Sequence, residues 1–366
     1  MTELKEICKV QCGFAFDSKK FTEDDSFSPL IRIRDVKRGF TQTYYTGEFS
    51  SEYIVHKGDL LVGMDGEFNI ARWNSEDALL NQRVCRIIAN SNVNEEYLRF
   101  YLKRTLKLIE SKTSFVTVKH LSAKELNGLK LNLPCMEDQQ CISKQLSILE
   151  LVIEKNKKVL ELFDELVKAR FVEMFGDPVI NDKKWLTVSV ENLCDEIYGG
   201  GTPSKAHEEY YENGDIPWVS SKDMKTDVLT DSQIKINQLG IENSTARLVP
   251  VNSVIMVIRS GILKHTLPVA INAVPITVNQ DLKVFIPGNK IISRFLAMQF
   301  KMHEKSILFG VRAVTADNIE FNSLKARRMI VPPLELQNQF ASFVEEIDKS
   351  RLLSNHSLFL TKSIIF

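Results

Sequence analysis

The amino-acid sequence repeats itself at a spacing of 198 residues. The dipeptide Asn81-Gln82 in LLNQRV returns as Asn279-Gln280 in TVNQDL (279 − 81 = 198). At the same spacing LPCMEDQQCISKQLSILE falls on VPPLELQNQFASFVEEID, and VTVKHLSAKELNGL falls on VRAVTADNIEFNSL after a small shift. A constant spacing over roughly seventy residues indicates a tandem duplication, in which both copies fold in the same way.

Each copy mixes strand-like and helix-like patterns. Short β-branched runs such as DLLVGM, RVCRIIA, SVIMVIRS and DLKVFIP are typical of strands, and residues 94–110 and 291–306 are typical of helices. The sequence therefore predicts an α+β domain of roughly 135–155 residues in each copy.

A long amphipathic helix is predicted over residues 137–175. Apolar residues recur there in alternating steps of four and three, which is the heptad pattern of a coiled-coil seam, and Gly176 and Pro178 in FGDP end the helix. The predicted seam residues are Ile142, Leu146, Leu149, Ile153, Asn156, Leu160, Phe163 and Val167. Such a helix is about 60 Å long, and its single apolar stripe requires a partner.

The second copy supplies a matching helix. Its seam residues are Phe340, Val344, Ile347 and Leu358, with Arg351, Ser354 and Thr361 interrupting the stripe. The predicted fold is α+β, with two tandem globular domains (1–136 and 178–334) separated by a pair of long antiparallel coiled-coil helices (137–177 and 335–366). The alternative, in which each helix packs only on its own domain, stays open.

Charge composition gives no support for nucleic-acid binding, because 47 Lys and Arg residues balance 47 Asp and Glu residues. Any DNA contact must then come from local basic clusters or from a partner. Six scattered cysteines without a CxxC pair indicate free thiols in a reducing cytoplasm. No stretch approaches the ~18 uninterrupted apolar residues of a membrane helix, and the N-terminus lacks the apolar core of a signal peptide.

The sequence resembles the specificity subunits of type I restriction-modification systems. The resemblance is carried by GFAFDSKKF, LIRIRDVKRG, YIVHKGDLLVGMDGEFNIARW, LLNQRV, ELVKARFVEMFGDP, GGGTPSK, GDIPWVSSKDM, TVNQDL and VPPLELQNQFASFVEEID, which span nearly the whole chain. None of these segments is decisive alone. Their order, the duplication and the two long helices make the resemblance specific.

This resemblance implies two target-recognition domains, each reading one half of a bipartite, asymmetric site in double-stranded DNA. The helices would set the gap between the half-sites and dock two modification (methyltransferase) subunits, which restriction (endonuclease/translocase) subunits join. Adenine methylation and cleavage would belong to those partners, together with S-adenosylmethionine, ATP and Mg. No catalytic residue, metal site or cofactor is expected on this chain, which would be cytoplasmic.

DNA reading should use Arg, Lys, Ser and Thr side chains on loops. The candidates in the first copy are Lys19, Lys20, Arg34, Lys37, Arg38, Lys112, Thr113, Ser114 and Lys119. Those in the second copy are Ser220, Ser221, Lys222, Arg259, Ser260, Lys264 and Arg312. Any one of these residues could equally be ordinary solvated surface, and only their clustering at matching positions favours a role.

Two other functional classes compete with DNA reading. A single-chain methyltransferase or nuclease is disfavoured, because the chain has no glycine-rich cofactor turn and no NPPY-type motif. The acid-x-lysine match of Asp281 with Lys283 has no acidic counterpart in the first copy, and such short matches are common by chance. A coiled-coil scaffold that binds protein is compatible with the neutral charge. YGGGTPSK lacks the spacing of a phosphate-binding loop and is interpreted as a turn.

The second helix is shorter than the first. The chain ends at Phe366, the equivalent of Lys168 (366 − 198 = 168), so ARFVEMFGDP has no counterpart. Either the last turns of the second helix are dispensable or partner docking is weaker there.

Overall fold

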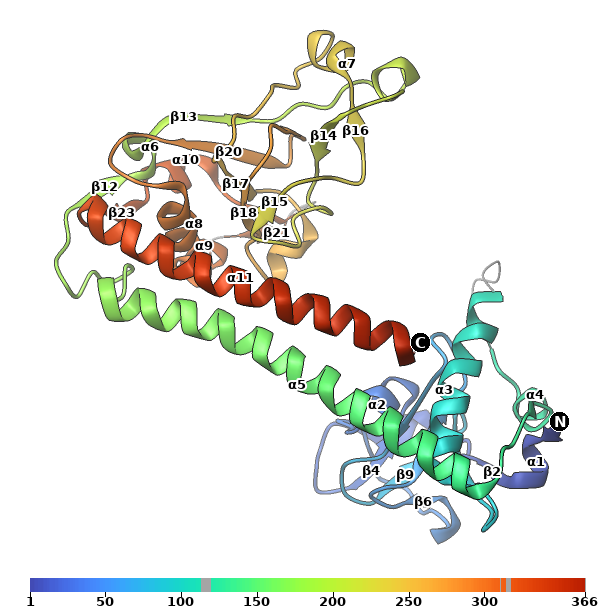
Figure 1. Ribbon diagram of the computed structural model, residues 1–366. Helices are drawn as coiled ribbons and strands as arrows, with labels where there is room; N and C mark the ends of the chain where they lie inside the picture. The colour runs from blue at the N-terminus through green and yellow to red at the C-terminus, as the bar shows by residue number, and fades with distance from the viewer. Residues whose placement is uncertain (113–119, 310, 314–316, 366) are drawn as a thin grey trace. The chain divides into compact units, whose positions relative to one another are not determined.

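The computed structural model (Figure 1) describes residues 1–112, 120–309, 311–313 and 317–365. The chain forms two compact units: Met1–Lys157 with Ser357–Phe366, and Lys158–His356. Both long helices are therefore divided between the units. The four sequence segments proposed above stay a prediction.

The first unit is built around an antiparallel sheet in the order β2-β10-β7-β8. A second sheet has the order β3-β5-β4-β9-β6, and β1 pairs with β11. The strands are β1 Thr2–Glu3, β2 Cys8–Cys12, β3 Phe21–Thr22, β4 Ser28–Ile31, β5 Tyr44–Tyr45, β6 Ile54–Val55, β7 Leu60–Gly63, β8 Asn69–Arg72, β9 Ala78–Leu80, β10 Val84–Ala89 and β11 Lys130–Leu131. The helices are α1 Leu4–Ile7, α2 Ile33–Arg38, α3 Glu95–Lys112 and α4 Ala123–Asn127, with 3₁₀ turns η1 Ser18–Lys20 and η2 Ser51–Tyr53.

The core of this unit lies between the first sheet and α3. Leu98, Leu102 and Leu106 recur every fourth residue, so they share one face of α3, and all three are fully buried. They belong to the same apolar cluster as Leu60 of β7 and Ile87 of β10. Each fully buried leucine contributes about 2 kcal/mol of transfer free energy.

The second unit repeats this architecture. Its main sheet has the order β13-β20-β17-β18-β15, with β16-β14-β19, β12-β23 and β21-β22 as smaller sheets. The strands are β12 Thr187–Ser189, β13 Cys194–Gly199, β14 Ile216–Val219, β15 Val228–Leu229, β16 Lys235–Ile236, β17 Val254–Val257, β18 Val269–Asn272, β19 Thr277–Val278, β20 Leu282–Pro287, β21 Arg312–Ala313, β22 Asp317–Asn318 and β23 Arg328–Ile330. The helices are α6 Val190–Leu193, α7 Gln238–Glu242, α8 Ser293–Met302, α9 Glu304–Leu308 and α10 Phe321–Ala326, with 3₁₀ turns η3 Glu208–Tyr210 and η4 Gly261–Lys264.

Strand pairing matches between the two copies. The order β2-β10-β7-β8 corresponds to β13-β20-β17-β18, and β1-β11 corresponds to β12-β23. The parallel pair β4-β9 likewise corresponds to the parallel pair β14-β19. The predicted tandem duplication is thus confirmed at the level of topology. One helix differs, because the counterpart of α3 is broken at His303 into α8 and α9.

The two long helices are α5 Met136–Phe175 and α11 Leu334–Ile365. Helix α5 ends where FGDP predicts, because Gly176 adopts the left-handed conformation (φ 76°) and its N–H donates to the Val172 carbonyl at 2.8 Å. The first turn carries Glu137 and Asp138, whose negative charges interact favourably with the positive end of the helix dipole.

The observed burial of side chains on both long helices agrees with the predicted seam. From Leu146 to Val167 every predicted seam residue is buried or half-buried, and so are the four apolar seam residues of α11. Ile142 departs from the prediction, because it is 37% exposed. Its neighbours Gln139 and Ser143 are buried instead, so the first turns of α5 turn a different face inward.

Within the second unit α5 and α11 run antiparallel. Phe171 of α5 contacts Phe340 of α11 (ring centroids 5.4 Å), and Asp164 earlier in α5 accepts a hydrogen bond from Arg351 later in α11 at 2.7 Å. Within the first unit Asn156 donates to the Ser357 hydroxyl at 3.2 Å. Two of the polar seam positions, Asn156 and Arg351, are therefore paired across the helices.

Candidate nucleic-acid interface

The repeated Asn-Gln dipeptides form equivalent turns at the ends of β9 and β19. The Asn81 side-chain oxygen accepts the Gln82 N–H at 2.8 Å, and the Asn279 side-chain oxygen accepts the Asp281 N–H at 3.1 Å. Both amides thus satisfy backbone donors of their own turn, which removes the cost of burying them unpaired. Their role in holding the turn follows from these contacts.

A glycine packs against each of these turns. A Cβ on Gly13 would lie 2.3 Å from the carbonyl oxygens of Leu80 and Asn81, and one on Gly200 would lie 2.0 Å from that of Val278. The glycine-rich YGGGTPSK segment thereby gains a structural explanation. Its backbone approaches a neighbouring strand too closely for any side chain.

The first unit contains a polar pocket of 660 Å³ at the candidate Arg34. Its lining residues are Phe21, Thr22, Glu23, Asp25, Arg32, Arg34, Gln42, Thr43 and Tyr44. Side chains with both donors and acceptors converge here, which suits contact with the polar edges of bases or with phosphate. Arg32 was not among the predicted residues, because only the tertiary structure brings it next to Gln42 and Tyr44.

A buried acid organises this pocket. Asp35 is almost fully buried, and its Oδ2 accepts the Arg32 N–H at 2.9 Å and the Thr41 hydroxyl at 3.0 Å. In the second copy Asp223 accepts the Ser220 N–H at 2.9 Å and the Ser220 hydroxyl at 2.8 Å. The predicted candidate Ser220 therefore caps its own turn.

The described candidates lie on short helices and turns. In the first copy, η1 carries Lys19 and Lys20, and α2 carries Arg34, Lys37 and Arg38. In the second copy, Lys222 follows β14, and β17 is followed by Arg259 and Ser260. Lys264 is the last residue of η4. The lysine and arginine side chains among them are exposed, whereas the candidates Ser220, Ser221 and Ser260 are half-buried. Lys37 is paired with Glu67 at 2.9 Å, and Arg259 with Asp281 at 2.6 Å.

Five candidates lie in, or next in sequence to, the segments outside the described residues. Thr113, Ser114 and Lys119 lie outside the described residues. Lys112 is the last residue of α3, and Arg312 lies in β21, which pairs with β22. A DNA-contacting role stays a prediction for these five residues and for all the other candidates.

Two lysines that were not among the predicted DNA contacts share one aromatic ring. The Lys283 and Lys325 ammonium groups lie 4.6 Å and 5.2 Å from the centre of the Phe321 ring. Burial, together with the positive charge of Lys325, lowers the pKa of Lys283. An anion such as phosphate would relieve this repulsion.

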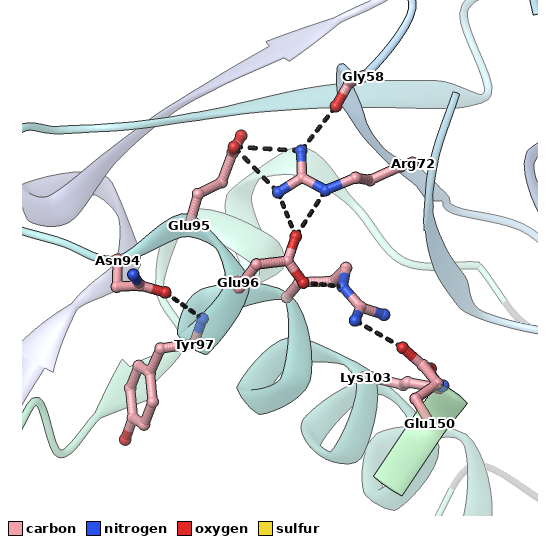
Figure 2. Close-up of polar contacts among 9 residues, drawn as sticks. Gly58, Arg72, Asn94, Glu95, Glu96, Tyr97, Lys103 and Glu150 are labelled. Atoms are coloured by element: carbon pink, nitrogen blue, oxygen red, sulfur yellow. Dashed lines mark hydrogen bonds and ion pairs between the residues drawn. The ribbon is translucent and has the colours of Figure 1, made fainter. Parts of the chain in front are cut away.

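A chain of ion pairs ties α5 to the sheet of the first unit (Figure 2). Arg72 at the end of β8 pairs with Glu95 and Glu96 at the start of α3, and Glu96 also accepts from Arg99 at 2.8 Å. Arg99 then donates to Glu150 of α5 at 2.6 Å. The second copy has the same kind of tether, because Arg294 of α8 pairs with Asp348 of α11 at 2.9 Å.

Glu150 makes this tether pH-dependent. Burial opposes its ionisation, but hydrogen bonds and charge from Arg99 and Lys103 outweigh burial and hold the pKa of Glu150 below its ordinary value of 4.5. A carboxylate with a lowered pKa stabilises the fold above its ordinary pKa, and that contribution is lost as the pH falls through the folded-state pKa.

Glu150→Gln is therefore expected to destabilise the first unit by about 1–2 kcal/mol at neutral pH. The cost should become progressively smaller as the pH falls below the ordinary glutamate pKa of 4.5. Urea unfolding of both proteins across this pH range measures the difference. Glu154→Gln, an exposed change one turn further along α5, is the control. A difference that did not shrink in acid would show that Glu150 does not act through its charge.

No helix in the part of the chain that the structure describes is both long enough and apolar enough to span a membrane.

Comparison with known proteins agrees with these features. The sequence profile of the "Type I restriction modification DNA specificity domain" matches residues 1–162 and 182–358. The specificity subunit of the EcoBI type I restriction enzyme of Escherichia coli is 39% identical over 195 residues, covering 51% of this chain and 41% of that protein. The specificity subunit of the Escherichia coli enzyme EcoR124I/EcoR124II is 26% identical over 317 residues, covering 85% of this chain and 77% of that protein.

The fold is also shared with a solved structure. The crystal structure of a type I restriction-modification S subunit from M. genitalium superposes with a TM-score of 0.58 at 13% identity, covering all of this chain and 93% of that one. The family profile matches both halves of the chain in succession, each over a domain of the same topology. The chain therefore belongs to the family of type I restriction-modification DNA specificity domains.

Proposed function

We propose that this chain is the DNA-reading subunit of a type I restriction-modification complex in the cytoplasm. Each globular domain reads one half of a bipartite site in double-stranded DNA. Adenine methylation and cleavage are performed by modification and restriction subunits, which carry S-adenosylmethionine, ATP and Mg. This chain contributes recognition and no catalytic group.

The duplicated framework with diverged surface chemistry carries this proposal. Strand order is the same in both copies, yet equivalent positions carry different side chains: Arg34 corresponds to Lys222, and Arg83 to Asp281. One framework holding two sets of donors and acceptors is the arrangement needed to read two different half-sites. Because the two sets differ, the target is asymmetric.

The long helices support the remaining roles. Half-sites on one face of a duplex recur about every 34–36 Å, and a helix of the length of α5 spans about 60 Å. Apolar side chains also stay uncovered on these helices, including Leu162 and Leu166 on α5 and Leu352 and Leu353 on α11. Such uncovered apolar surface favours docking of partner subunits, for which we propose two modification subunits.

The decisive experiment maps methylated adenines in cells that express this chain with its modification partner. Residues 179–333 are then exchanged for those of another family member. We expect one half of the methylated motif to change while the other half and the gap are retained. A change in both halves would exclude the arrangement of one half-site per domain.

Salt dependence separates DNA reading from a purely protein-binding scaffold. The complex of this chain with its modification subunit should bind duplex DNA in low salt and weaken steeply as salt rises, because bound phosphates release counterions. A scaffold would show no such binding at any salt concentration. Methyl transfer by the purified chain alone, with S-adenosylmethionine and DNA, would instead place catalysis here.

A further inference from the structure

An ion pair at the Asn-Gln turn occurs in both copies with its charges exchanged. In the first copy Arg83, directly after the turn, pairs with Asp65 at 3.2 Å. In the second copy Asp281, directly after the turn, pairs with Arg259 at 2.6 Å. The acid and the base have changed places between the two domains.

Backbone contacts establish that these positions are equivalent. Met64 donates its N–H to the Arg83 carbonyl at 3.1 Å, and Ile258 donates its N–H to the Asp281 carbonyl at 2.9 Å. The residue that follows, Asp65 or Arg259, forms an isolated antiparallel bridge to His120 or Asn318 respectively. The same frame therefore holds two side chains of opposite charge in opposite order.

The arginine is the outward member of the pair in both orders. The side chains of Arg83 and Arg259 are 51% and 48% exposed, whereas those of Asp65 and Asp281 are 21% and 26% exposed. Each acid also has a second partner, which is the His120 ring for Asp65 and the Asn279 side chain for Asp281 at 3.2 Å. The acids are anchored in the domain, and each presents one guanidinium to solvent.

Stability alone gives little reason for such a pair. A half-exposed ion pair contributes about 0–1 kcal/mol. An acid that fixes a guanidinium in advance does remove much of the entropy cost of ordering that side chain on a ligand. The planar fork of arginine suits phosphate oxygens and the guanine edge, both of which are acceptors.

We propose that Arg83 and Arg259 are the corresponding DNA-contacting arginines of the two domains, each oriented by its acid, although they come from opposite sides of the ion pair. Arg259 was a candidate on sequence grounds, whereas Arg83 was not, because the two arginines do not align. The proposal rests on the proposed function and adds the residues that carry it. The site requires an arginine held by an acid. The arginine can come from the segment after the Asn-Gln turn, as Arg83 does, or from the segment after the paired strand, as Arg259 does.

The test uses the full chain in complex with its modification subunit, bound to a duplex that contains its methylated motif. Arg83→Gln should weaken binding by about tenfold or more. The double change Asp65→Arg/Arg83→Asp, which reproduces the order found in the second copy, should restore affinity to within about threefold of the parent. The neutral pair Asp65→Asn/Arg83→Gln should stay as weak as Arg83→Gln.

The neutral double variant distinguishes direct contact of Arg83 with DNA from a purely structural role of the ion pair. If the ion pair only held the fold, the complex with two neutral hydrogen-bonding side chains at these positions would bind DNA as well as the parent, and the proposal would be wrong. A charge-exchanged variant as weak as Arg83→Gln would also overturn it, because the two orders would not be equivalent. Lys5→Gln, which breaks the exposed Lys5–Glu3 pair of the same unit (2.6 Å), controls for the loss of one positive charge.

Two measurements show whether the arginine contacts a DNA phosphate or a base. Contact with phosphate predicts that Arg83→Gln lowers the slope of log affinity against log salt by about 1 and leaves the methylated motif unchanged. Contact with a base predicts that one half of the motif relaxes, and that Arg259→Gln relaxes the other half. If the parent complex binds no duplex, the proposed function itself fails; if the parent binds and neither arginine matters, only this inference fails.

Discussion

Replacing Phe171 by alanine is expected to lower the free energy of unfolding of the second unit by about 3–5 kcal/mol. Phe171 of α5 is fully buried, and its ring lies 5.3 Å from that of Phe295 on α8 and 5.4 Å from that of Phe340 on α11. The truncation removes a ring that three helices share. The resulting cavity cannot close without moving all of them.

Segment-resolved hydrogen exchange combined with urea unfolding measures this effect. Exchange locates the loss in the second unit, which matters because a chain of two compact units need not unfold in one step. Leu162→Ala, at a position 47% exposed on the same helix, is the matched control and should stay within about 0.5 kcal/mol of the parent. Equal costs for the two substitutions would mean that the aromatic cluster does not hold α5 in place.

Gln337→Ala is expected to cost about 3 kcal/mol or more, which is unusual for a polar residue. The Gln337 side chain is fully buried and serves three backbone groups. Its amide donates to the carbonyls of Pro332 at 2.8 Å and Lys290 at 3.0 Å, and its oxygen accepts the Ile292 N–H at 3.1 Å. Alanine would leave these buried groups unpaired, and the junction between α8 and α11 would loosen.

The neighbouring Gln339→Ala provides the comparison. Gln339 is exposed on the same helix, where alanine has the higher helix propensity, so this change should be neutral or slightly stabilising. In the first copy Gln139 accepts the Asn94 N–H and donates to the Pro134 carbonyl, both at 2.9 Å, so Gln139→Ala should be costly and Gln140→Ala should not. Thermal unfolding of the four variants tests both junctions, and equal transition temperatures within each pair would refute this role.

The equivalence of Gln139 and Gln337 was visible in the sequence, but its reason was not. Spacing identified them as the same position in two copies. Only the structure shows that each amide joins the start of a long helix to the segment before α3 or α8. The role of Glu150 was likewise not predictable from the sequence, because its hydrogen bond with Arg99 depends on how α5 packs against α3.

The candidate DNA contacts divide in the same way. Arg34 could be chosen from sequence because it lies in a locally basic stretch, and the structure places it in a polar pocket. Arg83 could not be chosen, because its partner Asp65 is 18 residues away (83 − 65 = 18) and the aligned position in the other copy is an acid. Ser220 was chosen for its hydroxyl, which the structure commits to Asp223.

By itself the sequence determined the duplication, the α+β class, the two long helices with their seam, and the stop of α5 at Gly176. These features depend on sequence periodicity and on local backbone preference, so each can be predicted from a short stretch of consecutive residues. The tertiary structure alone decided which face the first turns of α5 bury, why glycine is required at Gly13 and Gly200, and which acid holds which arginine. Those features depend on contacts between distant segments, whose register is set only when the strands pair and the helices pack.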